Sequence, residues 1–499
     1  MEHDAQEVDV LIVGAGPVGL ITAYQLARFG GVSVRIIEKH EKSMQEAYGR
    51  AITLYPRSSE MLDQLGLADD LAQQCFACRE TAAYNAKGEE VHGRGWNFME
   101  NMKDTAWDFA LVLRQKFQED VFRKRMQRHD VEVEAPVELK AIAIDECIPV
   151  GGMRIAAQVH DGRTGKIGKI LCKYLIGCDG GRSSVRGMLD IPFEGSTTED
   201  RWVRIDGIVK TNLPKPRTYC AIESPTHGNV LWVGLDRGAT RIGYAFTAER
   251  AKAYETFHEV AAIKEAIAAV KPFNLEFERV DWWTIYSIGQ RVAKSFFVKD
   301  CIFLAGDAGH THSSGAAQGM NTGIHDSVNL AWKLSLVLRG LAAPGLLHTY
   351  QAERLPNVQK LIRYDRDIST LMTNRLPEAW TGDPGEDVNV VLGRIMAEAG
   401  TFSSGLGIFY ELGDDVASVD GSFENDGSTH AVRAGKRAPD VPLTKPGTWD
   451  TTRLILQTPN EARFYVLIFA DNPIVSVERS FCDVASRSSV LRSLQNLSE

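Results

Sequence analysis

A glycine-rich turn near the N-terminus, set between a short apolar strand and a helix, constrains the fold of this chain most strongly. Residues 9–13 form a β-branched apolar run that predicts a buried strand, and the GxGxxG turn of residues 14–19 follows it directly. Residues 20–29 then place apolar side chains at helical spacing, and a second apolar run, 32–37, ends on Glu38. The order strand, glycine turn, helix, strand and acidic residue predicts a βαβ unit that binds a dinucleotide.

Each part of this unit has a physical role. Gly14 permits the tight turn, Gly16 lets the backbone approach a pyrophosphate, and Gly19 lets the helix pack closely against the strand. The helix N-terminus offers unpaired N–H groups and a partial positive charge to the phosphates. An acidic residue after the second strand accepts hydrogen bonds from ribose hydroxyls and repels a 2′-phosphate, which favours FAD or NAD over NADP. The residues expected at this half of the cofactor are Gly14, Gly16, Pro17, Gly19, Glu38 and Lys39.

A second segment shows a strand that runs into an acidic and glycine-rich turn. The strand 173–178 leads into Asp179 and Gly180, and this turn can form a backbone nest that binds an anion. Arg182 and Arg186 would add positive charge for a phosphate. A surface turn with two solvated arginines is the alternative interpretation.

A third segment combines a buried strand with a long amphipathic helix. The strand 301–305 leads to Asp307, whose carboxylate is suited to bind a polyol hydroxyl, and the helix 319–338 follows a polar loop. The first turn of that helix can direct N–H groups near Met320 and Asn321 at a developing negative charge. A reduced flavin carries such a charge at N1 and the C2 carbonyl.

The composition excludes several classes of protein. A net charge of −9 and a pI near 5.8 argue against nucleic-acid binding, because phosphate binding depends on clustered Lys and Arg. The 8 cysteines of this long chain indicate reduced intracellular thiols, and no metal-ligand set stands out. The apolar run 11–27 follows acidic residues and contains glycines and a proline, so neither a signal sequence nor stable membrane insertion is expected. We expect a cytoplasmic protein.

Taken in order, the three motifs resemble a known family. GxGxxG at residues 14–19, DGxxSxxR at 179–186 and GDAxH followed by QGMNTGxxDxxNLxWKL within 306–334 are similar to the class A flavoprotein monooxygenases. Within them the chain resembles the phenol hydroxylase group, which has the p-hydroxybenzoate hydroxylase fold, over residues 8–365. Three ordered motifs identify FAD as the dinucleotide.

The expected architecture is α/β, with a Rossmann-like FAD-binding domain and an interleaved, mostly antiparallel β-sheet substrate domain. A short C-terminal segment resembles the start of the group's thioredoxin-like domain and would stabilise the chain or contact a second copy in a homodimer. The expected divisions are an FAD-binding domain of residues 1–75, 110–191 and 291–375, a substrate domain of 76–109 and 192–290, a connecting region of 376–430, and the shortened thioredoxin-like segment 431–499.

The resemblance assigns further cofactor-binding residues. In the family, an arginine of a Gly-Arg-Ala element contacts the pyrophosphate and a glutamine of a Leu-x-Gln element reaches the flavin side, which correspond to Arg50 and Gln115. The DG motif serves both FAD and transient NADPH, the GD motif binds the ribityl chain, and the next glutamine and helix start border the isoalloxazine. The residues so implied are Arg50, Gln115, Asp179, Gly180, Arg182, Gly306, Asp307, Gln318, Gly319, Met320 and Asn321.

The resemblance implies an enzyme that hydroxylates a phenolic or other electron-rich, small aromatic substrate. NADPH, preferred over NADH, would reduce non-covalently bound FAD, and O2 would then form a C4a-hydroperoxyflavin that delivers one oxygen atom. The same chemistry could produce epoxidation, Baeyer–Villiger ring expansion or dearomatisation of a polycyclic or indole metabolite. A non-catalytic protein that kept the fold and binds flavin or a ligand is the second alternative.

Candidate catalytic residues follow from the same resemblance. The segment 286–291 matches the group's Tyr-x-Ile-Gly-Gln-Arg, so Tyr286 is a candidate together with Arg50. The group's aspartate after Gly-x-Ala is replaced by Ile52, which cannot take a proton. His310 or His312 could substitute as a base, or could equally cap the loop, and the substrate could also need no deprotonation.

The substrate pocket is expected on the antiparallel sheet and on the loop after His312. Packing in the core is the alternative for each aromatic residue. In the loop, Ser314 replaces the family's proline, and Ala316 and Ala317 replace its paired glycines, which puts the usual rigidity of the loop in question. The candidate pocket residues are Trp232, Tyr244, Trp283, Tyr286 and Ser314.

Overall fold

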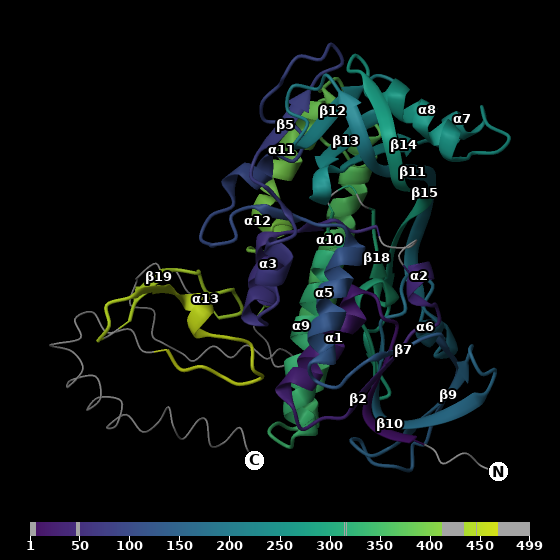
Figure 1. Cartoon of the computed structure of the whole chain (residues 1–499), viewed down its shortest axis with the longest axis vertical. Coiled ribbons are helices and arrows are strands. Elements are labelled where there is room, and N and C mark those ends of the chain that lie inside the picture. Colours follow the sequence, from purple (N-terminus) through teal and green to yellow (C-terminus); the bar gives the residue numbers. More distant parts are fainter. Residues whose placement is uncertain are drawn as a thin grey trace.

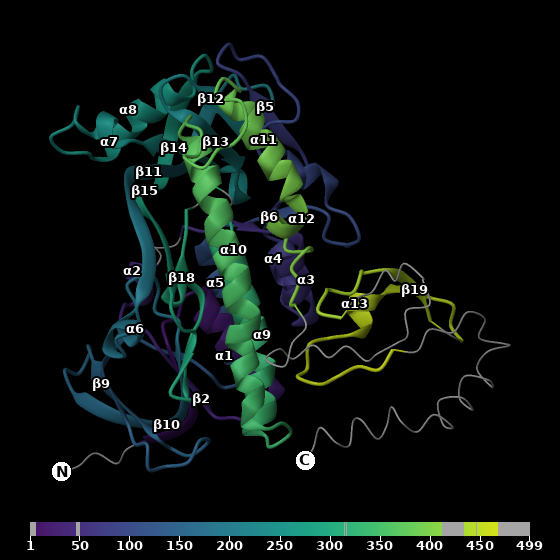
Figure 2. The ribbon, with the colours of Figure 1, turned by 180° about the vertical axis from the view of Figure 1, so that it is seen from behind.

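Two main β-sheets lie toward opposite ends of the chain's long axis, and helices run between them (Figures 1 and 2). This computed structural model describes residues 6–45, 50–313, 315, 317–411, 434–445 and 447–467. Among these residues, no helix combines the length and the apolar character that a membrane crossing requires.

The first sheet is mostly parallel and carries the N-terminal glycine turn. β1 pairs in parallel with β10 on one side and β2 on the other, and the last four residues of β1 are buried, as its apolar run predicts. The main path is β16–β17–β10–β1–β2–β7, and β9 and β8 extend the sheet from β10 by antiparallel pairing. Its strands are β1 (Gln6–Val13), β2 (Val34–Ile37), β7 (Val133–Glu134), β8 (Val137–Ile144), β9 (Ile155–Asp161), β10 (Ile167–Gly177), β16 (Phe297–Val298) and β17 (Ile302–Leu304).

The second sheet is antiparallel except where β12 pairs in parallel with β5 at one edge. β11 and β15 contain 19 residues each and pair along most of their length, which carries the sheet down to β18 beside the first sheet. The strand order is β18 (His310–Thr311), β15 (Leu275–Ala293), β11 (Phe193–Thr211), β14 (Thr240–Phe246), β13 (Gly228–Gly234), β12 (Tyr219–Ser224) and β5 (Thr81–Tyr84).

Helices cover both sheets and connect them. α1 packs against α5 and α9 beside the first sheet, and the long α10 extends from there to the second sheet (Figures 1 and 2). The α-helices are α1 (Pro17–Phe29), α2 (Lys42–Gln45), α3 (Pro56–Gln64), α4 (Ala68–Ala72), α5 (Gln115–Gln127), α6 (Ser184–Met188), α7 (Ala248–Ala251), α8 (Glu259–Ala269), α9 (Gly319–Leu338), α10 (His348–Met372), α11 (Val388–Glu398), α12 (Gly400–Ser403) and α13 (Leu454–Gln457). Single 3-10 turns are η1 (Asn97–Asn101), η2 (Asp236–Gly238), η3 (Gly306–Ala308) and η4 (Pro344–Leu347), and short strands are β3 (Thr53–Leu54), β4 (Phe76–Cys78), β6 (Ala110–Val112), β19 (Pro442–Thr444) and β20 (Thr451–Arg453).

The two faces of the second sheet bury different side chains. One face packs against α8 and includes Val203 and Ile205 of β11. The other face includes Trp202 of β11 and packs with Tyr55, which directly follows β3, and with Ile368 of α10. Because successive residues of a strand point to opposite faces, the parity of a position decides whether it meets α8 or the cofactor-binding elements.

The region 376–430 contains helices that the sequence analysis did not expect. α11 and α12 occupy part of the predicted connecting region. Val391, Leu392 and Met396 of α11 are buried in the hydrophobic cluster that contains Trp202, on the face of the second sheet opposite α8. The Asp387 side chain accepts a hydrogen bond from the Asn389 N–H at 2.8 Å, so it caps α11. An N-cap aspartate before an apolar stripe is the signal that could have predicted this helix.

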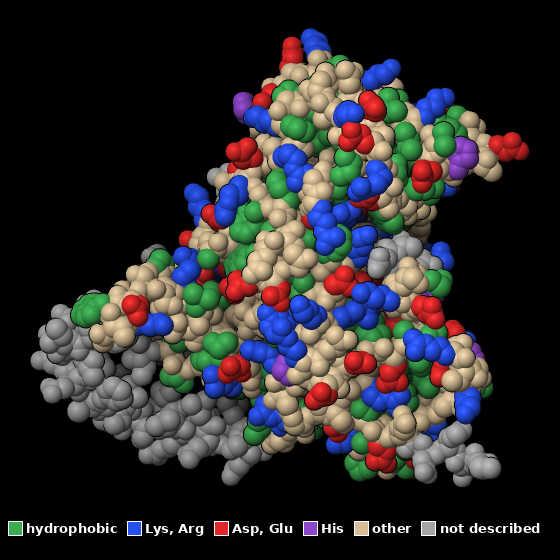
Figure 3. Space-filling model, viewed as in Figure 1, with side chains coloured by type: hydrophobic (Ala, Val, Ile, Leu, Met, Phe, Trp, Pro, Cys, Tyr) green, Lys and Arg blue, Asp and Glu red, His purple; other side chains and the backbone are tan. Residues whose placement is uncertain are grey.

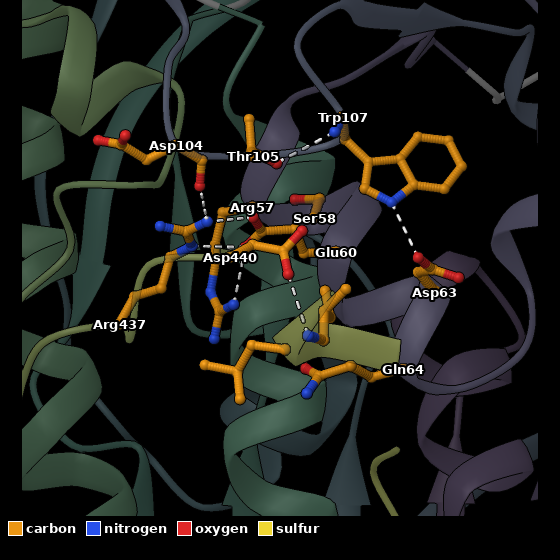
Figure 4. Close-up of polar contacts among 12 residues, drawn as sticks. Arg57, Ser58, Glu60, Asp63, Gln64, Asp104, Thr105, Trp107, Arg437 and Asp440 are labelled. Carbon is orange, nitrogen blue, oxygen red and sulfur yellow. Dashed lines mark hydrogen bonds and ion pairs between the residues drawn. The ribbon is translucent and has the colours of Figure 1, made fainter. Parts of the chain in front are cut away.

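The described part of the C-terminal segment lies against α3 (Figure 4). Arg437 donates from Nε to Glu60 Oε2 at 2.7 Å and from Nη2 to the Asp104 carbonyl at 2.5 Å, and Arg57 lies 2.9 Å from the same carboxylate. Glu60 is fully buried, so two guanidinium groups compensate its charge. A thioredoxin-like domain stays a prediction, because residues 412–433 and 468–499 lie outside the described residues.

Candidate functional site

The glycine turn after β1 has the close contacts that its sequence predicts. Gly14 has a φ of 103°, and a Cβ there would lie 2.4 Å from the Cys178 carbonyl oxygen. A Cβ on Gly19 would lie 2.0 Å from the Gly14 carbonyl oxygen, so only glycine lets α1 approach the turn this closely. Gly16, in contrast, has no protein atom within 4 Å of its ideal Cβ. A ligand can therefore approach the backbone closely at Gly16.

The start of α1 is suited to bind a phosphate group. Gly16 is the N-cap and provides no side chain to cap the helix, and Pro17 occupies the first turn. The free N–H groups of this turn and the helix dipole therefore remain available to an anion.

Glu38 lies beside the turn at the end of β2. Its Oε2 accepts a hydrogen bond from the Ala15 N–H at 2.9 Å, and Oε1 accepts one from the His40 N–H at 3.0 Å. Each carboxylate oxygen can accept a second bond, so a ribose hydroxyl can share this group. Lys39, the next residue, is exposed.

One face of α5 places three polar residues beside the turn. Gln115 accepts from the Ala51 N–H at 3.1 Å and donates to Glu119 at 2.8 Å. Arg123 donates to the Ala15 carbonyl at 3.2 Å, and its buried Nε has no partner among the described residues. Burial raises the pKa of Glu119 to about 7, against the opposing effect of the Gln115 amide, and burial also lowers the pKa of Arg123.

Sequence reasoning found Gln115 but missed Glu119 and Arg123. The signal was present, since residues 115, 119 and 123 are spaced by four and so share a helix face.

The DG turn caps a short helix. Asp179 Oδ2 accepts from the Ser184 N–H at 2.6 Å, from its hydroxyl at 2.8 Å and from the Val185 N–H at 3.1 Å. Asp179 Oδ1 is buried and has no partner among the described residues, so it can accept a hydrogen bond from a ligand. Gly180 has a φ of 81°, and Arg182 is exposed.

Arg186 has a different role from the phosphate contact that the sequence suggested. Its side chain is buried and donates to the carbonyls of Ala308 and Gly181, each at 2.8 Å. It therefore binds the DG turn to the GD turn, because these carbonyls belong to the two motifs.

The GD turn is held from beneath by a buried ionic group. Asp326 of α9 accepts from the Gly306 N–H at 3.0 Å and from Arg354 Nε at 2.8 Å, and it hydrogen-bonds His310 Nε2 at 2.7 Å. His310 is fully buried and binds the carboxylate that holds the turn, so this candidate base has a structural position here. Asp307, on the same turn, is exposed.

The start of α9 is tied to β3 and to α12 by hydrogen bonds of its side chains. The Asn321 side chain accepts from the Tyr55 N–H at 2.8 Å and donates to the Thr53 carbonyl at 3.0 Å, which fastens β3 to the helix. Gln318 donates to the Ser403 carbonyl at 2.7 Å, and so its amide is directed at α12. Gly319 and Met320 form the first turn, whose N-cap has no side-chain hydrogen bond. The helix dipole can therefore act on a negative charge there.

The loop before α9 is held at several points. Asp365 accepts from the Ser313 N–H at 2.7 Å and from its hydroxyl at 2.6 Å, and Trp96 donates to the Gly315 carbonyl at 3.1 Å. The buried His312 Nε2 has no partner among the described residues. Ser314 and Ala316 lie outside the described residues.

The candidate pocket residues divide between the two faces of the second sheet. Tyr286 lies on the cofactor side, where the Arg50 guanidinium is 4.9 Å from its ring centroid. Trp232, Tyr244 and Trp283 belong to the cluster on the α8 side, and the Tyr244 hydroxyl donates to the Ala262 carbonyl of α8 at 2.8 Å. The structure therefore does not bring these three residues to Tyr286.

Parity explains this division. Tyr286 and Trp283 are three positions apart on one strand, so they point to opposite faces. The cofactor side instead presents aromatic residues that the sequence analysis did not select, which are Tyr55, Trp96, Phe98, Trp202 and Tyr219.

Together these features suit FAD. The open space at Gly16, the uncapped start of α1 and the unpartnered Asp179 oxygen lie on the turns that follow β1 and β10, and the GD turn follows β17. The carboxyl ends of neighbouring parallel strands meet at one edge of a sheet, where dinucleotides bind.

Comparison with known proteins points to the same cofactor. Residues 7–365 match the family described as FAD binding domain. Phenol 2-monooxygenase of Aspergillus fumigatus is 32% identical over 381 residues, which are 75% of this chain and 62% of that protein. The 3-hydroxybenzoate 4-monooxygenase of Comamonas testosteroni is 31% identical over 430 residues, 81% of this chain and 65% of that protein. The chain thus spans less than two thirds of the length of these two relatives.

Solved structures share the fold. Anhydrotetracycline hydroxylase from Streptomyces rimosus has a TM-score of 0.70 at 23% identity, covering 96% of this chain and 88% of that one. Aklavinone-11 hydroxylase, in a complex with FAD and aklavinone, has a TM-score of 0.70 at 22% identity, covering 91% and 83%. The family match spans both sheets and the turns at Gly14, Asp179 and Gly306, so this chain belongs to the family of FAD binding domains.

Proposed function

We propose that this chain is an FAD-dependent monooxygenase that uses NAD(P)H and O2 to hydroxylate a phenolic or other electron-rich aromatic compound. The observation that carries this proposal is the aromatic face of the second sheet, where Trp202, Tyr219 and Tyr286 are turned to the cofactor-binding elements. The names of the two relatives, phenol 2-monooxygenase and 3-hydroxybenzoate 4-monooxygenase, support it.

The proposed reaction inserts one oxygen atom into a C–H bond of the substrate. One NAD(P)H, one proton and one O2 are consumed, and the products are the hydroxylated substrate, NAD(P)+ and water. When bound, FAD accepts the hydride and activates O2. The protein contributes binding, orientation and the exclusion of water.

For FAD, the proposed contacts follow the geometry of the turns. The first turn of α1 binds the pyrophosphate, Glu38 the ribose hydroxyls and Asp307 the ribityl chain. The uncapped start of α9 stabilises negative charge on the reduced ring by about 0.3–1 kcal/mol or more when buried. Arg50, Gln115, Asp179, Gly180 and Arg182 complete this set.

For the nicotinamide cofactor, a surface rather than a second fold is proposed. Figure 3 shows Lys and Arg side chains gathered on one face between the two ends of the molecule. Such a region attracts a phosphate-bearing donor, and the preference for NADPH comes from the resemblance of the motifs.

For the substrate, Tyr286 is the proposed contact to the reacting hydroxyl. Ionising a phenol of pKa near 10 at pH 7 costs about 4 kcal/mol, so a nearby acceptor or positive charge accelerates the reaction. Arg50 lies over the Tyr286 ring and supplies positive charge. Each histidine has one buried ring nitrogen without a partner among the described residues, Nδ1 of His310 and Nε2 of His312. His312 is the proposed base of the two, because the other nitrogen of His310 is bound to the buried Asp326.

The test is turnover of a phenol panel by the FAD-loaded protein under labelled oxygen (18O2). We expect substrate to accelerate NADPH oxidation and the product to gain one labelled atom. Product structure then distinguishes hydroxylation from epoxidation, ring expansion or dearomatisation. If no phenol or polycyclic aromatic accelerates flavin reduction or acquires label, the non-catalytic alternative is correct.

A further inference from the structure

Arg123 of α5 lies beside the glycine turn that follows β1. Its Nη2 donates to the carbonyl of Ala15, inside the turn, at 3.2 Å, and it also donates to the side-chain oxygen of Gln45. α5 packs along α1, whose N-terminus follows the same turn (Figures 1 and 2). The guanidinium is therefore in contact with the turn on which the ADP half of FAD is expected.

The position of Arg123 on its helix agrees with this placement. Residues 115, 119 and 123 follow at intervals of four, so their side chains share one face of α5. Gln115, at the start of this face, accepts from the Ala51 N–H and donates to Glu119. Arg123 adds a positive charge to this polar face.

Neutral groups bind the guanidinium of Arg123. Its two hydrogen-bond partners among the described residues, the Ala15 carbonyl and the Gln45 amide, carry no charge. Burial lowers the pKa of Arg123, and the nearby carboxylates of Glu38 and α5 do not offset this effect. A partly buried cation that is incompletely compensated gains from a neighbouring anion.

One donor of Arg123 is left without a bond. Its Nε is buried and has no hydrogen-bond partner among the described residues. Such donors are rare in folded proteins, because an unmade hydrogen bond costs free energy. Gly16, on the same turn, has no protein atom within 4 Å of the position of a Cβ, so a ligand has room to approach. An oxygen atom of a bound ligand would satisfy Nε.

We propose that Arg123 binds an oxygen atom of the ADP half of FAD through its Nε. Pyrophosphate oxygens and ribose hydroxyls can both accept this hydrogen bond, and the bond to a charged phosphate would be the stronger one. The inference rests on the cofactor of the proposed function and is independent of its aromatic substrate.

The experiment compares fragments of the cofactor by isothermal titration calorimetry on the whole chain freed of FAD. ADP carries the pyrophosphate and the ribose, adenosine carries the ribose without phosphate, and riboflavin represents the other half of FAD. Arg123→Gln should weaken the binding of ADP about tenfold or more and change the binding of riboflavin less than about twofold. An unchanged affinity for adenosine would assign the contact to the pyrophosphate, and an equal loss for adenosine would assign it to the ribose.

Arg128→Gln is the matched control, because Arg128 is exposed at the C-terminal end of the same helix. This control should change the affinity for ADP less than about twofold. Urea unfolding then separates binding of the ligand from support of the turn. Because Nε has no partner without a ligand, Arg123→Gln should leave the urea midpoint of the FAD-free chain unchanged and lower that of the FAD-loaded chain.

The proposal is overturned if Arg123→Gln binds ADP as tightly as Arg128→Gln, or if the binding of riboflavin falls as much as that of ADP. It is also overturned if Arg123→Gln lowers the urea midpoint of the FAD-free chain as much as that of the FAD-loaded chain. Failure of the proposed function would look different. In that case the fragments of FAD would bind as expected, but no substrate would take up labelled oxygen.

Discussion

The buried carboxylate of Asp326 offers the sharpest test of how the fold supports the cofactor site. It lies beneath the GD turn, is fully buried, and binds His310, Arg354 and the Gly306 N–H. Burial alone would raise its pKa, but His310 and Arg354 overcome that effect and lower the pKa to about 2. Asp326→Asn would keep the shape of the side chain and remove its charge.

The expected loss of unfolding free energy depends on the partners that Asp326→Asn leaves without a carboxylate. Arg354 is 1% exposed, so it would remain a buried cation without its carboxylate. Breaking such a pair on one side costs about 3–5 kcal/mol in the free energy of unfolding. If the altered bond to Gly306 also displaces Asp307, the loss of one hydrogen bond of about 1.4 kcal/mol would weaken FAD binding about tenfold.

Urea unfolding of the FAD-loaded protein and FAD titration of the apoprotein measure the two effects. Asp120→Asn is the control, because Asp120 pairs with Lys42 on the surface, where a salt bridge contributes at most about 1 kcal/mol. A lowered folded pKa contributes stability that is present above about pH 4 and is lost as pH falls toward 2. The difference between wild type and Asp326→Asn should therefore shrink as the pH falls from about 4 toward 2. A loss no larger than that of Asp120→Asn would refute the reasoning.

Three further predictions concern the cofactor turn, α5 and the substrate face. Gly16→Ala should change the unfolding free energy of the apoprotein by less than about 1 kcal/mol but should weaken FAD binding. Gly19→Ala should lower the unfolding free energy by at least about 2 kcal/mol, because its Cβ would lie 2.0 Å from the Gly14 oxygen. Similar unfolding curves for the two variants would contradict this prediction. The pKa of Glu119 is raised to about 7, so the stability that this shift contributes is fully present below about pH 4.5 and is lost as pH rises through 7. Glu119→Gln should therefore exceed the wild type in unfolding free energy by about 1–3 kcal/mol at pH 8 and much less at pH 5, and an equal difference at both would sink the idea. Tyr286→Phe should slow hydroxylation of a simple phenol about tenfold at unchanged FAD content, and unchanged turnover would remove Tyr286 from the mechanism.

Local patterns accounted for the parts of the site that depend on short stretches of chain. The tight contacts of Gly14 and Gly19 and the position of Glu38 beside the turn agree with the geometry that a GxGxxG unit requires. Apart from the Gly14 contact, which is made with Cys178 at the end of β10, every atom involved belongs to one strand-turn-helix-strand unit. Such contacts repeat wherever the unit occurs, so its sequence suffices to predict them.

Residues on the second sheet could not be placed in this way. Aromatic character made Trp232, Tyr244 and Trp283 candidates, but it carries no information on which face of a sheet meets another domain. Register decides that, and the register of β11 with β15 includes shifts that single-strand patterns do not reveal. Had parity been applied to β15 from Tyr286, Trp283 would have been assigned to the α8 side.

By itself, then, the sequence determined the cofactor: a dinucleotide turn with Glu38, and three ordered motifs that indicate FAD. Only the tertiary structure decided that His310 supports the GD turn through Asp326, and that Trp283 packs on the opposite face of the second sheet from Tyr286. The physical reason is the range of the interactions. Hydrogen bonds within a turn join residues close in the chain, whereas burial and charge compensation depend on segments that meet only after folding.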